Sequence, residues 1–199
     1  MASIDVANDP DLLNHMAEAG CFNILIGFES LNPASLEKTG KHHNRKGLSY
    51  PEAIRRIHAA GIQINASFVV GFDHDTTEEF NRIFEFTVAN ALPNVNLHLL
   101  GAPPGTETYR KLEAEGRLSL ISQDMGVGHF PTIHYWNMSQ SEIFEAYIDT
   151  VEKLYSFETL LVKARMLFSQ GTFIRKGGEI SPMMKVRLSR ITVKEYLFS

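Results

Sequence analysis

Apolar segments that end in polar turns recur along the first part of this chain, and a helical pattern follows each of them. The four segments, each a predicted strand with its turn, span residues 3–7, 23–30, 65–75 and 96–106. Alternation of strands and helices is typical of βα units. The order therefore predicts an α/β fold with a parallel sheet of about four strands, as in part of a (β/α) TIM-like barrel.

Start and stop signals delimit the predicted helices. Asp9-Pro10 and Asn32-Pro33 are start signals, and Gly20, Gly40, Gly61 and Gly116 are stops. Ser49-x-x-Glu52 and Thr76-x-x-Glu79 have the spacing of capping boxes, and Thr106 begins a further helix. We expect these helices to cover the sheet.

Beyond residue 120 the strand pattern stops. Residues 121–138 show no steady period, which indicates an irregular linker with a short strand around Ile133. Helices are predicted from Ser139, over 156–169 and from Pro182, with Leu167 and Phe168 facing inward in the second of them. Residues 1–120 are thus the barrel part and residues 121–199 a helical extension.

One face of each predicted strand is polar, whereas parallel strands covered on both sides are continuously apolar. Asn65 and Ser67 share a face of the third strand, and Asn96 and His98 share a face of the fourth. We expect this face to line a barrel interior or cleft, with Glu29 and Asp73 continuing it by parity. The alternative is a hydrogen-bonded polar core.

Composition excludes several classes of function. A net charge of −4 argues against a general nucleic-acid binder. A single cysteine, Cys21, excludes an intramolecular disulfide and a cysteine-based metal cluster within the chain, and makes the cytoplasm the expected location. The start is not that of a signal peptide, and no apolar run is long enough to cross a bilayer, so no membrane partner is expected.

Three strand-end turns carry candidate chemistry. In Gly27-Phe28-Glu29-Ser30, a carboxylate could accept hydrogen bonds from a ligand ammonium or ribose, or simply precede a helix. In 71–76, Asp73, His74 and Asp75 could hold a divalent metal, although adjacent residues on a turn seldom converge. Pro103-Pro104-Gly105-Thr106 leads into a helix N-terminus that suits an anion, or is a plain tight turn.

The histidines offer no recognisable catalytic or metal pattern. His58 lies on a predicted helix and is expected to be exposed, while His129 and His134 lie in the linker without metal-ligand spacing. The basic stretch 42–46 is interpreted as a solvated loop. No Ser-His-Asp arrangement follows from spacing, so no catalytic residue and no metal ligand is assigned.

Three motifs in order resemble the radical S-adenosylmethionine superfamily, and most closely its subclass with a cobalamin-binding domain. They are Ile26-Gly27-Phe28-Glu29-Ser30, the stretch 67–76, and Pro104-Gly105-Thr106-x-x-Tyr109 with Gly116-Arg117-Leu118. The resemblance covers about residues 1–120. It implies a partial (β/α)6 barrel, a 4Fe-4S cluster, cleavage of S-adenosylmethionine to a 5′-deoxyadenosyl radical and, with cobalamin, methyl transfer.

The resemblance also assigns positions near S-adenosylmethionine. Glu29 and Ser30 match residues near its amino acid or ribose, the Gly71 to Asp75 turn matches the next strand end, and 104–106 matches the turn after the last barrel strand. With the polar strand faces added, the predicted cofactor-binding residues are the following: Glu29, Ser30, Asn65, Ser67, Gly71, Asp73, His98, Pro104 and Gly105.

One departure from the family limits the expectation. The Cys-x-x-x-Cys-x-x-Cys loop that holds the cluster is absent, as are the first two βα units. The chain is therefore expected to be a C-terminal fragment of a longer enzyme, inactive alone, that binds a small-molecule cofactor and an unidentified substrate. Its uncovered barrel edge would be adhesive, so we expect either a homodimer through that edge or coverage by the C-terminal helices.

Two other functions remain compatible with the residues. A non-catalytic α/β binding or interaction module would use its polar strand faces only as a hydrogen-bonded core. An unrelated barrel enzyme would use Glu29, Asp73 and His98 for acid–base or metal chemistry. Binding of S-adenosylmethionine, cobalamin or divalent metals would separate these alternatives.

Overall fold

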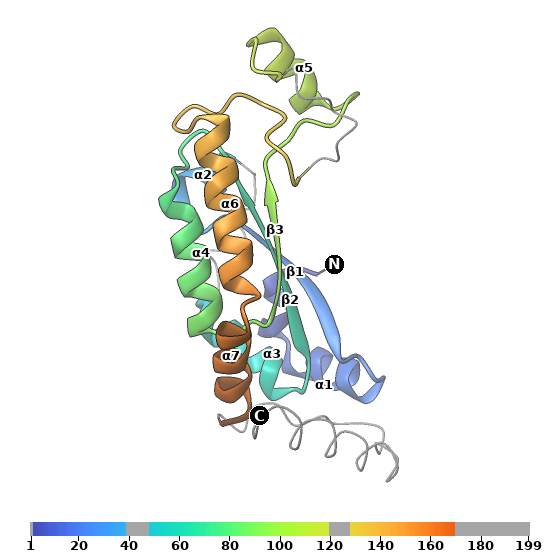
Figure 1. Cartoon of the computed structure of the whole chain (residues 1–199). Coiled ribbons are helices and arrows are strands. Elements are labelled where there is room, and N and C mark those ends of the chain that lie inside the picture. Colours follow the sequence, from blue (N-terminus) through green and yellow to red (C-terminus); the bar gives the residue numbers. More distant parts are fainter. Residues whose placement is uncertain (1, 39–47, 120–127, 170–199) are drawn as a thin grey trace.

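A three-stranded parallel sheet forms the centre of the molecule (Figure 1). The computed structural model describes residues 2–38, 48–119 and 128–169. The strands, in spatial order, are β1 (Asn23–Glu29), β2 (Gln63–Val70) and β3 (Asn94–Leu99). The helices are η1 (Ile4–Asn8), α1 (Pro10–Glu18), α2 (Pro33–Lys38), α3 (Tyr50–Ala59), α4 (Glu78–Ala89), α5 (Glu107–Ala114), α6 (Gln140–Leu154) and α7 (Phe157–Ser169).

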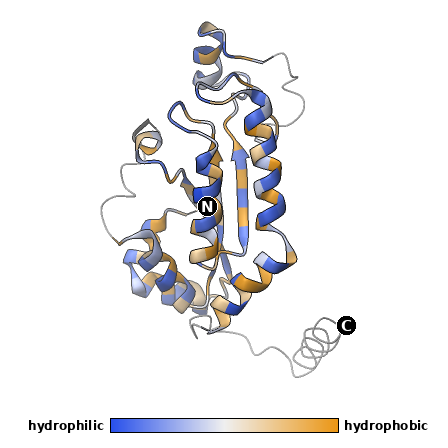
Figure 2. Ribbon diagram, turned by 60° about the vertical axis from the view of Figure 1, so that its left-hand side comes forward, coloured by the Kyte–Doolittle hydropathy of each residue, from blue (hydrophilic) through white to orange (hydrophobic). Residues whose placement is uncertain are grey.

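The two faces of the sheet differ as the alternating sequence predicts. Every second residue of β2, from Ile64 to Val70, is buried, and the residues between them are only half-buried. β3 alternates in the same way, and the bands along the strand in Figure 2 show this change between hydrophobic and hydrophilic positions. The prediction of one apolar and one polar strand face is confirmed for β2 and β3.

An aromatic cluster joins the apolar face to its covering helices. Phe28 of β1 stacks on Phe68 of β2 with ring centroids 5.2 Å apart. Tyr50 of α3 and Phe86 of α4 meet the Phe28 ring edge-on. Such pairs add about 0.5–1.5 kcal/mol each beyond their buried area. The helices therefore cover the apolar face, and the polar face is turned away from them.

The C-terminal helices complete this layer. α6 packs against α4 and β3, and the two helices run side by side in Figure 1. α6 begins at a complete capping box, in which Ser139 and Glu142 each bond the other's backbone amide. Its predicted start and that of α7 are confirmed. The helix predicted from Pro182 lies outside the described residues.

The first predicted strand is wrong. Residues Ile4–Asn8 form a 3-10 helix, because the Ser3 hydroxyl accepts the Asp5 amide at 3.3 Å and thereby closes a turn. Ile4 and Ala7, three residues apart, are both buried as that helix requires. Only Ala2 pairs with β1, opposite Ile26. Within its described residues, the structure has three parallel strands, and a four-stranded barrel segment is not shown.

Two predicted capping boxes are not formed. Ser49 precedes α3 but its side chain makes no cap bond, since Glu52 is instead held by Arg55 and Arg56 one turn further along. α4 begins two residues after Thr76, at Glu78. In both cases the acidic residue bonds an arginine of the same helix. Salt bridges within the first turns therefore replace the reciprocal caps.

Two burial predictions are also wrong. His58 is buried on α3, with 2% of its surface exposed. On α7, Leu167 is buried as expected, but Phe168 is 72% exposed and Lys163 is fully buried. Residues 163 and 167 share one face of the helix, and this face, rather than the more apolar one, packs inward.

None of the helices that the structure describes has both the length and the apolar character needed to cross a membrane.

Candidate functional site

Neighbouring strands bring small and polar side chains into register on the polar face of the sheet. Gly27 of β1, Ser67 of β2 and Asn96 of β3 lie in one row across the three strands. Ser67 and Asn96 are half-buried, and Gly27 adds no side chain to the row. The centre of this face therefore carries small or polar side chains and no large apolar one.

Asn65 lies two residues before Ser67 in β2, on the same face. Its side-chain oxygen Oδ1 is buried and has no hydrogen-bond partner. A buried acceptor without a donor costs about 1–3 kcal/mol. A bound group that donates a hydrogen bond there would remove this penalty, so Asn65 is the residue of the polar face that most clearly lacks a partner.

Glu29 ends β1 in a strained conformation. Its φ is +63°, which is unusual for a residue with a side chain, and the register with β2 shifts between Gly27 and Glu29. A bulge of this kind re-aims a side chain. Burial and the His129 ring lower the pKa of His98, and the Glu29 carboxylate is within electrostatic range and opposes this shift. Glu29 and His98, from β1 and β3, thus influence one another across β2.

The surroundings of His98 favour its neutral form. Burial is the largest influence and lowers the pKa of His98, and the His129 ring, 5.3 Å away between centroids, lowers it further. His129 in turn lies with Nδ1 2.8 Å from the Tyr147 hydroxyl. A β-carbon at Gly128 would come within 3.0 Å of His98 Nδ1, so the chain passes directly against this imidazole.

Ser30 serves the turn after β1. It is 3% exposed, and its Oγ accepts the backbone amide of Asn32 at 3.0 Å. The Asn32 side chain reaches the next strand end, donating to the carbonyl of His74 at 3.2 Å and lying 3.4 Å from an Asp75 oxygen. Ser30 and Asn32 therefore fix the turn after β1 to the turn after β2.

Asp75 organises the turn after β2 from within. It is 1% exposed, and its Oδ2 accepts the amides of Gly71 and Phe72, each at 3.0 Å. Its Oδ1 accepts the Ser35 hydroxyl at 2.6 Å. These bonds occupy the carboxylate, so Asp75 is a structural centre of this turn.

Asp73 points to a different place from the polar strand face. β2 ends at Val70, and Gly71 has a φ of +118°, so strand parity does not extend to Asp73. The Asp73 carboxylate instead binds Arg117 at 3.0 Å. The structure therefore does not group Asp73 with Glu29 and His98 as one site.

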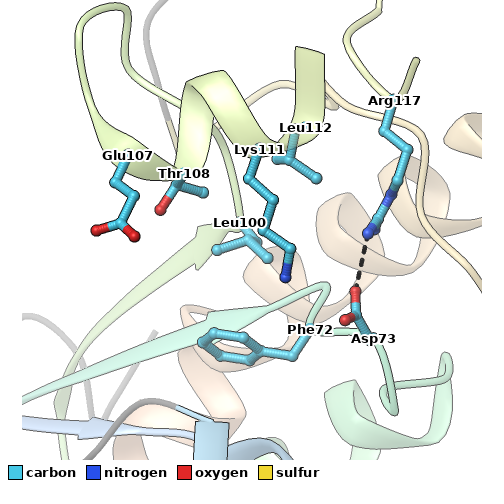
Figure 3. A pocket seen from close by; sticks show the side chains of 8 residues that line it. All are labelled: Phe72, Asp73, Leu100, Glu107, Thr108, Lys111, Leu112 and Arg117. Carbon is cyan, nitrogen blue, oxygen red and sulfur yellow. Dashed lines mark hydrogen bonds and ion pairs between the residues drawn. The ribbon is translucent and has the colours of Figure 1, made fainter. Parts of the chain in front are cut away.

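A pocket of about 380 Å³ lies beside this ion pair, between the strand ends and α5 (Figure 3). Arg117 is held by the His134 carbonyl at 2.9 Å and by Asp73, and its guanidinium carbon lies 4.9 Å from the centre of the Trp136 ring. The pocket is lined by Phe72, Asp73, Leu100, Glu107, Thr108, Lys111, Leu112 and Arg117.

Pro104 and Gly105 form an exposed turn before α5, beyond the end of β3 in Figure 1. Thr106 caps the helix by accepting the Tyr109 amide at 3.2 Å. The predicted tight turn is confirmed, while neither Pro104 nor Gly105 lies on the polar sheet face.

Of the residues that line the pocket, the sequence predicts only Asp73 as a site residue. Arg117 belongs to one of the three motifs, but neither it nor Lys111 is predicted as a site residue. The partner of Arg117 is 44 positions away, and no local pattern links the two. Among residues 2–38, 48–119 and 128–169, no three histidine, cysteine or acidic side chains gather as a metal site.

Comparison with known proteins shows that part of the chain is similar in sequence to methyltransferases. It is 32% identical over 117 residues to the hopanoid C-2 methylase of Rhodopseudomonas palustris, covering 59% of this chain and 22% of that protein. It is 26% identical over 118 residues to the bacteriochlorophyllide d C-8(2)-methyltransferase of Chlorobaculum tepidum, covering 59% of this chain and 26% of that protein. An uncharacterized methyltransferase of Synechocystis matches at 32% over 117 residues, with 22% of that protein covered.

No family model matches the chain. The matched stretch spans about a quarter or less of the length of these relatives. At a coarse level, the chain is thus similar to a segment of methyltransferases.

Proposed function

We propose that this chain is part of a radical S-adenosylmethionine methyltransferase, and that its polar sheet face contributes to the S-adenosylmethionine site. Support comes from the similarity to methyltransferases and from the order of the three motifs along the chain. Glu29 carries the proposal, because it ends β1 at a bulge with a positive φ, and its carboxylate is within electrostatic range of His98 on the polar face.

The residues of this face suit the chemical groups of S-adenosylmethionine. That molecule carries a positive sulfonium, an ammonium, and donors on its ribose and adenine. The Glu29 carboxylate would attract the positive groups, and the unpartnered Oδ1 of Asn65 would accept a hydrogen bond. The row of Gly27, Ser67 and Asn96 adds small or polar side chains to the same face.

The cluster of this superfamily does not fit the residues of this chain. A 4Fe-4S cluster needs several thiolate ligands. The chain has one cysteine, Cys21, whose sulfur lies 3.6 Å from the carbonyl of Asn23. We therefore derive no step through the cluster. Cluster ligands and cobalamin, if used, would belong to the longer enzyme, and we assign no residue here to either.

What these residues would do is bind and orient. In the proposed site, Glu29 would fix the charged end of S-adenosylmethionine, and Asn65 would set its rotation above the sheet. His98 would be neutral at pH 7, because burial and His129 both lower its pKa, and it would thus add no positive charge that repels a sulfonium. The substrate that receives the methyl group is not specified by these residues.

Calorimetric titration of the chain with S-adenosylmethionine tests the proposal. We expect saturable binding, weakened about fivefold or more in Glu29→Gln because a charge-assisted contact is lost. Glu18→Gln is the matched control, since Glu18 is exposed on α1. Binding that is absent, or equal in Glu29→Gln and Glu18→Gln, would overturn the proposal.

Parallel titrations distinguish the other functions. Tight binding of zinc or magnesium, lost in His98→Gln, would favour a metal-using enzyme. Binding of none of these ligands would favour a non-catalytic module. Either result would contradict the proposed site.

A further inference from the structure

The pocket beside Arg117 combines an apolar interior with charged groups. Phe72 follows β2, Leu100 follows β3, and Leu112 is buried on the inner side of α5. These three side chains surround the space in Figure 3. Pockets at the carboxyl ends of parallel strands are common ligand sites, and 380 Å³ falls within their usual size range.

The two cations that line the pocket have different roles. Arg117 is 7% exposed and already engaged by Asp73, Glu115 and the His134 carbonyl. Its Nη2 is buried without a hydrogen-bond partner among the described residues, and the side chain, held through Nε and Nη1, forms part of the wall. The Lys111 side chain is 65% exposed, and Glu115 approaches its ammonium only to 3.9 Å. In Figure 3 the Lys111 ammonium extends into the space between Leu112 and Phe72.

Glu107, one helical turn before Lys111, lines the same pocket. Figure 3 shows its carboxylate on the far side of the space from Arg117, with Lys111 between them. An anionic group would thus be attracted by Lys111 and repelled by Glu107. The electrostatic potential of the pocket is therefore more negative near Glu107 and more positive near Lys111.

We propose that this pocket binds a small carboxylate with an apolar body. Its carboxylate would pair with the Lys111 ammonium, and its body would lie against Phe72, Leu100 and Leu112. The site is distinct from the polar sheet face, because Asp73 pairs with Arg117 at the pocket and not with Glu29 or His98. The inference goes beyond the proposed function and requires no S-adenosylmethionine.

Amide NMR titration with 4-phenylbutyrate tests the inference, with 4-phenyl-1-butanol as the uncharged analogue. We expect 4-phenylbutyrate to shift the amide signals of Phe72, Leu100 and Leu112, and the alcohol to bind more weakly. Lys111→Met should weaken 4-phenylbutyrate binding roughly three- to fivefold, as for a partly exposed ion pair. Glu107→Gln should strengthen it.

Arg110→Met is the matched control, because Arg110 directly precedes Lys111 on α5, carries the same charge, is exposed and does not line the pocket. It should change the affinity by less than about twofold, as screening by water predicts. Lys111 is itself exposed, so Lys111→Met should melt at the wild-type temperature.

Three outcomes would overturn the inference. They are equal effects of Lys111→Met and Arg110→Met, equal affinity for the acid and the alcohol, and signal shifts confined to other parts of the molecule. None of them bears on S-adenosylmethionine binding at the polar face, so failure of this inference is distinguishable from failure of the proposed function.

Discussion

At the scale of single residues, several contacts hold the turn after β2 in one conformation. Asp75 holds the amides of Gly71 and Phe72, and the Tyr135 ring closes over Gly71. A Gly-Phe-Asp-His-Asp sequence suggests ligands for a metal. Its second aspartate, Asp75, instead accepts hydrogen bonds from backbone amides of its own turn. The chemistry of the acid is here structural, since it satisfies amides that would otherwise be buried without acceptors.

Replacement of Asp75 by asparagine should destabilise the fold by about 2–3 kcal/mol, because an amide nitrogen replaces one acceptor and leaves a buried donor unsatisfied. The urea midpoint measures this loss. Asp11→Asn, at an exposed position of α1, is the control and should change little. Equal stability of the two variants would show that the Asp75 bonds are not needed.

Gly71→Ala should be more damaging than Gly20→Ala. Both glycines have positive φ values, +118° and +87°, so both variants incur backbone strain of about 1–2 kcal/mol. At Gly71 a β-carbon would also lie 2.5 Å from a Tyr135 ring carbon, whereas at Gly20 it meets nothing within 4 Å. Because of this overpacking, the free energy of unfolding of Gly71→Ala should be lower than that of Gly20→Ala by at least about 1 kcal/mol, and thermal melts would show it as a lower melting temperature. Similar melting temperatures would contradict the close contact.

At the scale of secondary-structure elements, the hydrophobic period predicts a strand correctly where only one face of the strand is fully buried. The alternation in β2 and β3 identified both strands and their polar faces, because a half-covered sheet imposes a period of two. The segment 3–7 has the same alternation, but its length is short and Ser3 provides a local cap, so a 3-10 helix forms instead. The capping-box pattern predicted the start of α6 correctly. It predicted a cap wrongly at α3, where Arg55 binds the Glu52 carboxylate that the box would use.

Helix α3 carries a buried imidazole, which should make the fold sensitive to acid. Burial lowers the pKa of His58 to about 4 from 6.5. The unfolded chain therefore takes up this proton below pH 6.5, while the folded chain resists it until about pH 4, so stability falls as the pH drops through this window. By pH 5 the loss from His58 is about 2 kcal/mol.

His58→Leu should remove this part of the pH dependence, as urea unfolding at pH 7 and pH 5 would show. His15→Leu is the control, because His15 is exposed on α1. If His58→Leu and the wild-type protein lost equal stability between the two pH values, the neutral buried imidazole would be disproved.

On α7, Lys163 is expected to destabilise the protein at neutral pH. It is fully buried, its Nζ has no partner, and burial lowers its pKa to about 8 from 10.5. The unfolded chain binds the proton more tightly, so stability should rise as the pH increases from 8 to 10.5. Lys163→Met should add about 1–3 kcal/mol at pH 7 and abolish that rise.

Chemical unfolding across this pH range checks the prediction for Lys163, with exposed Lys153→Met as the control. A destabilised Lys163→Met protein would mean that the ammonium is required by the packing of α7.

At the scale of the whole molecule, the two faces of the sheet differ in what covers them. Helices α3 and α4 contact β2, α6 contacts β3, and Asn65 and His98 lie on the half-buried polar face. Sequence periodicity predicted this division. It did not predict the Asp73–Arg117 pair, since the contact depends on how the turn after β2 meets the segment after α5.

Mapping of amide NMR shifts is the sharpest test of the proposed binding of S-adenosylmethionine to the polar face of the sheet. Added S-adenosylmethionine should shift the signals of Glu29, Ser67, Asn96 and His98, and should leave those of α4, which packs on the apolar face, unchanged. Shifts confined to α4, or no saturable shift on the polar face, would show that S-adenosylmethionine does not bind there.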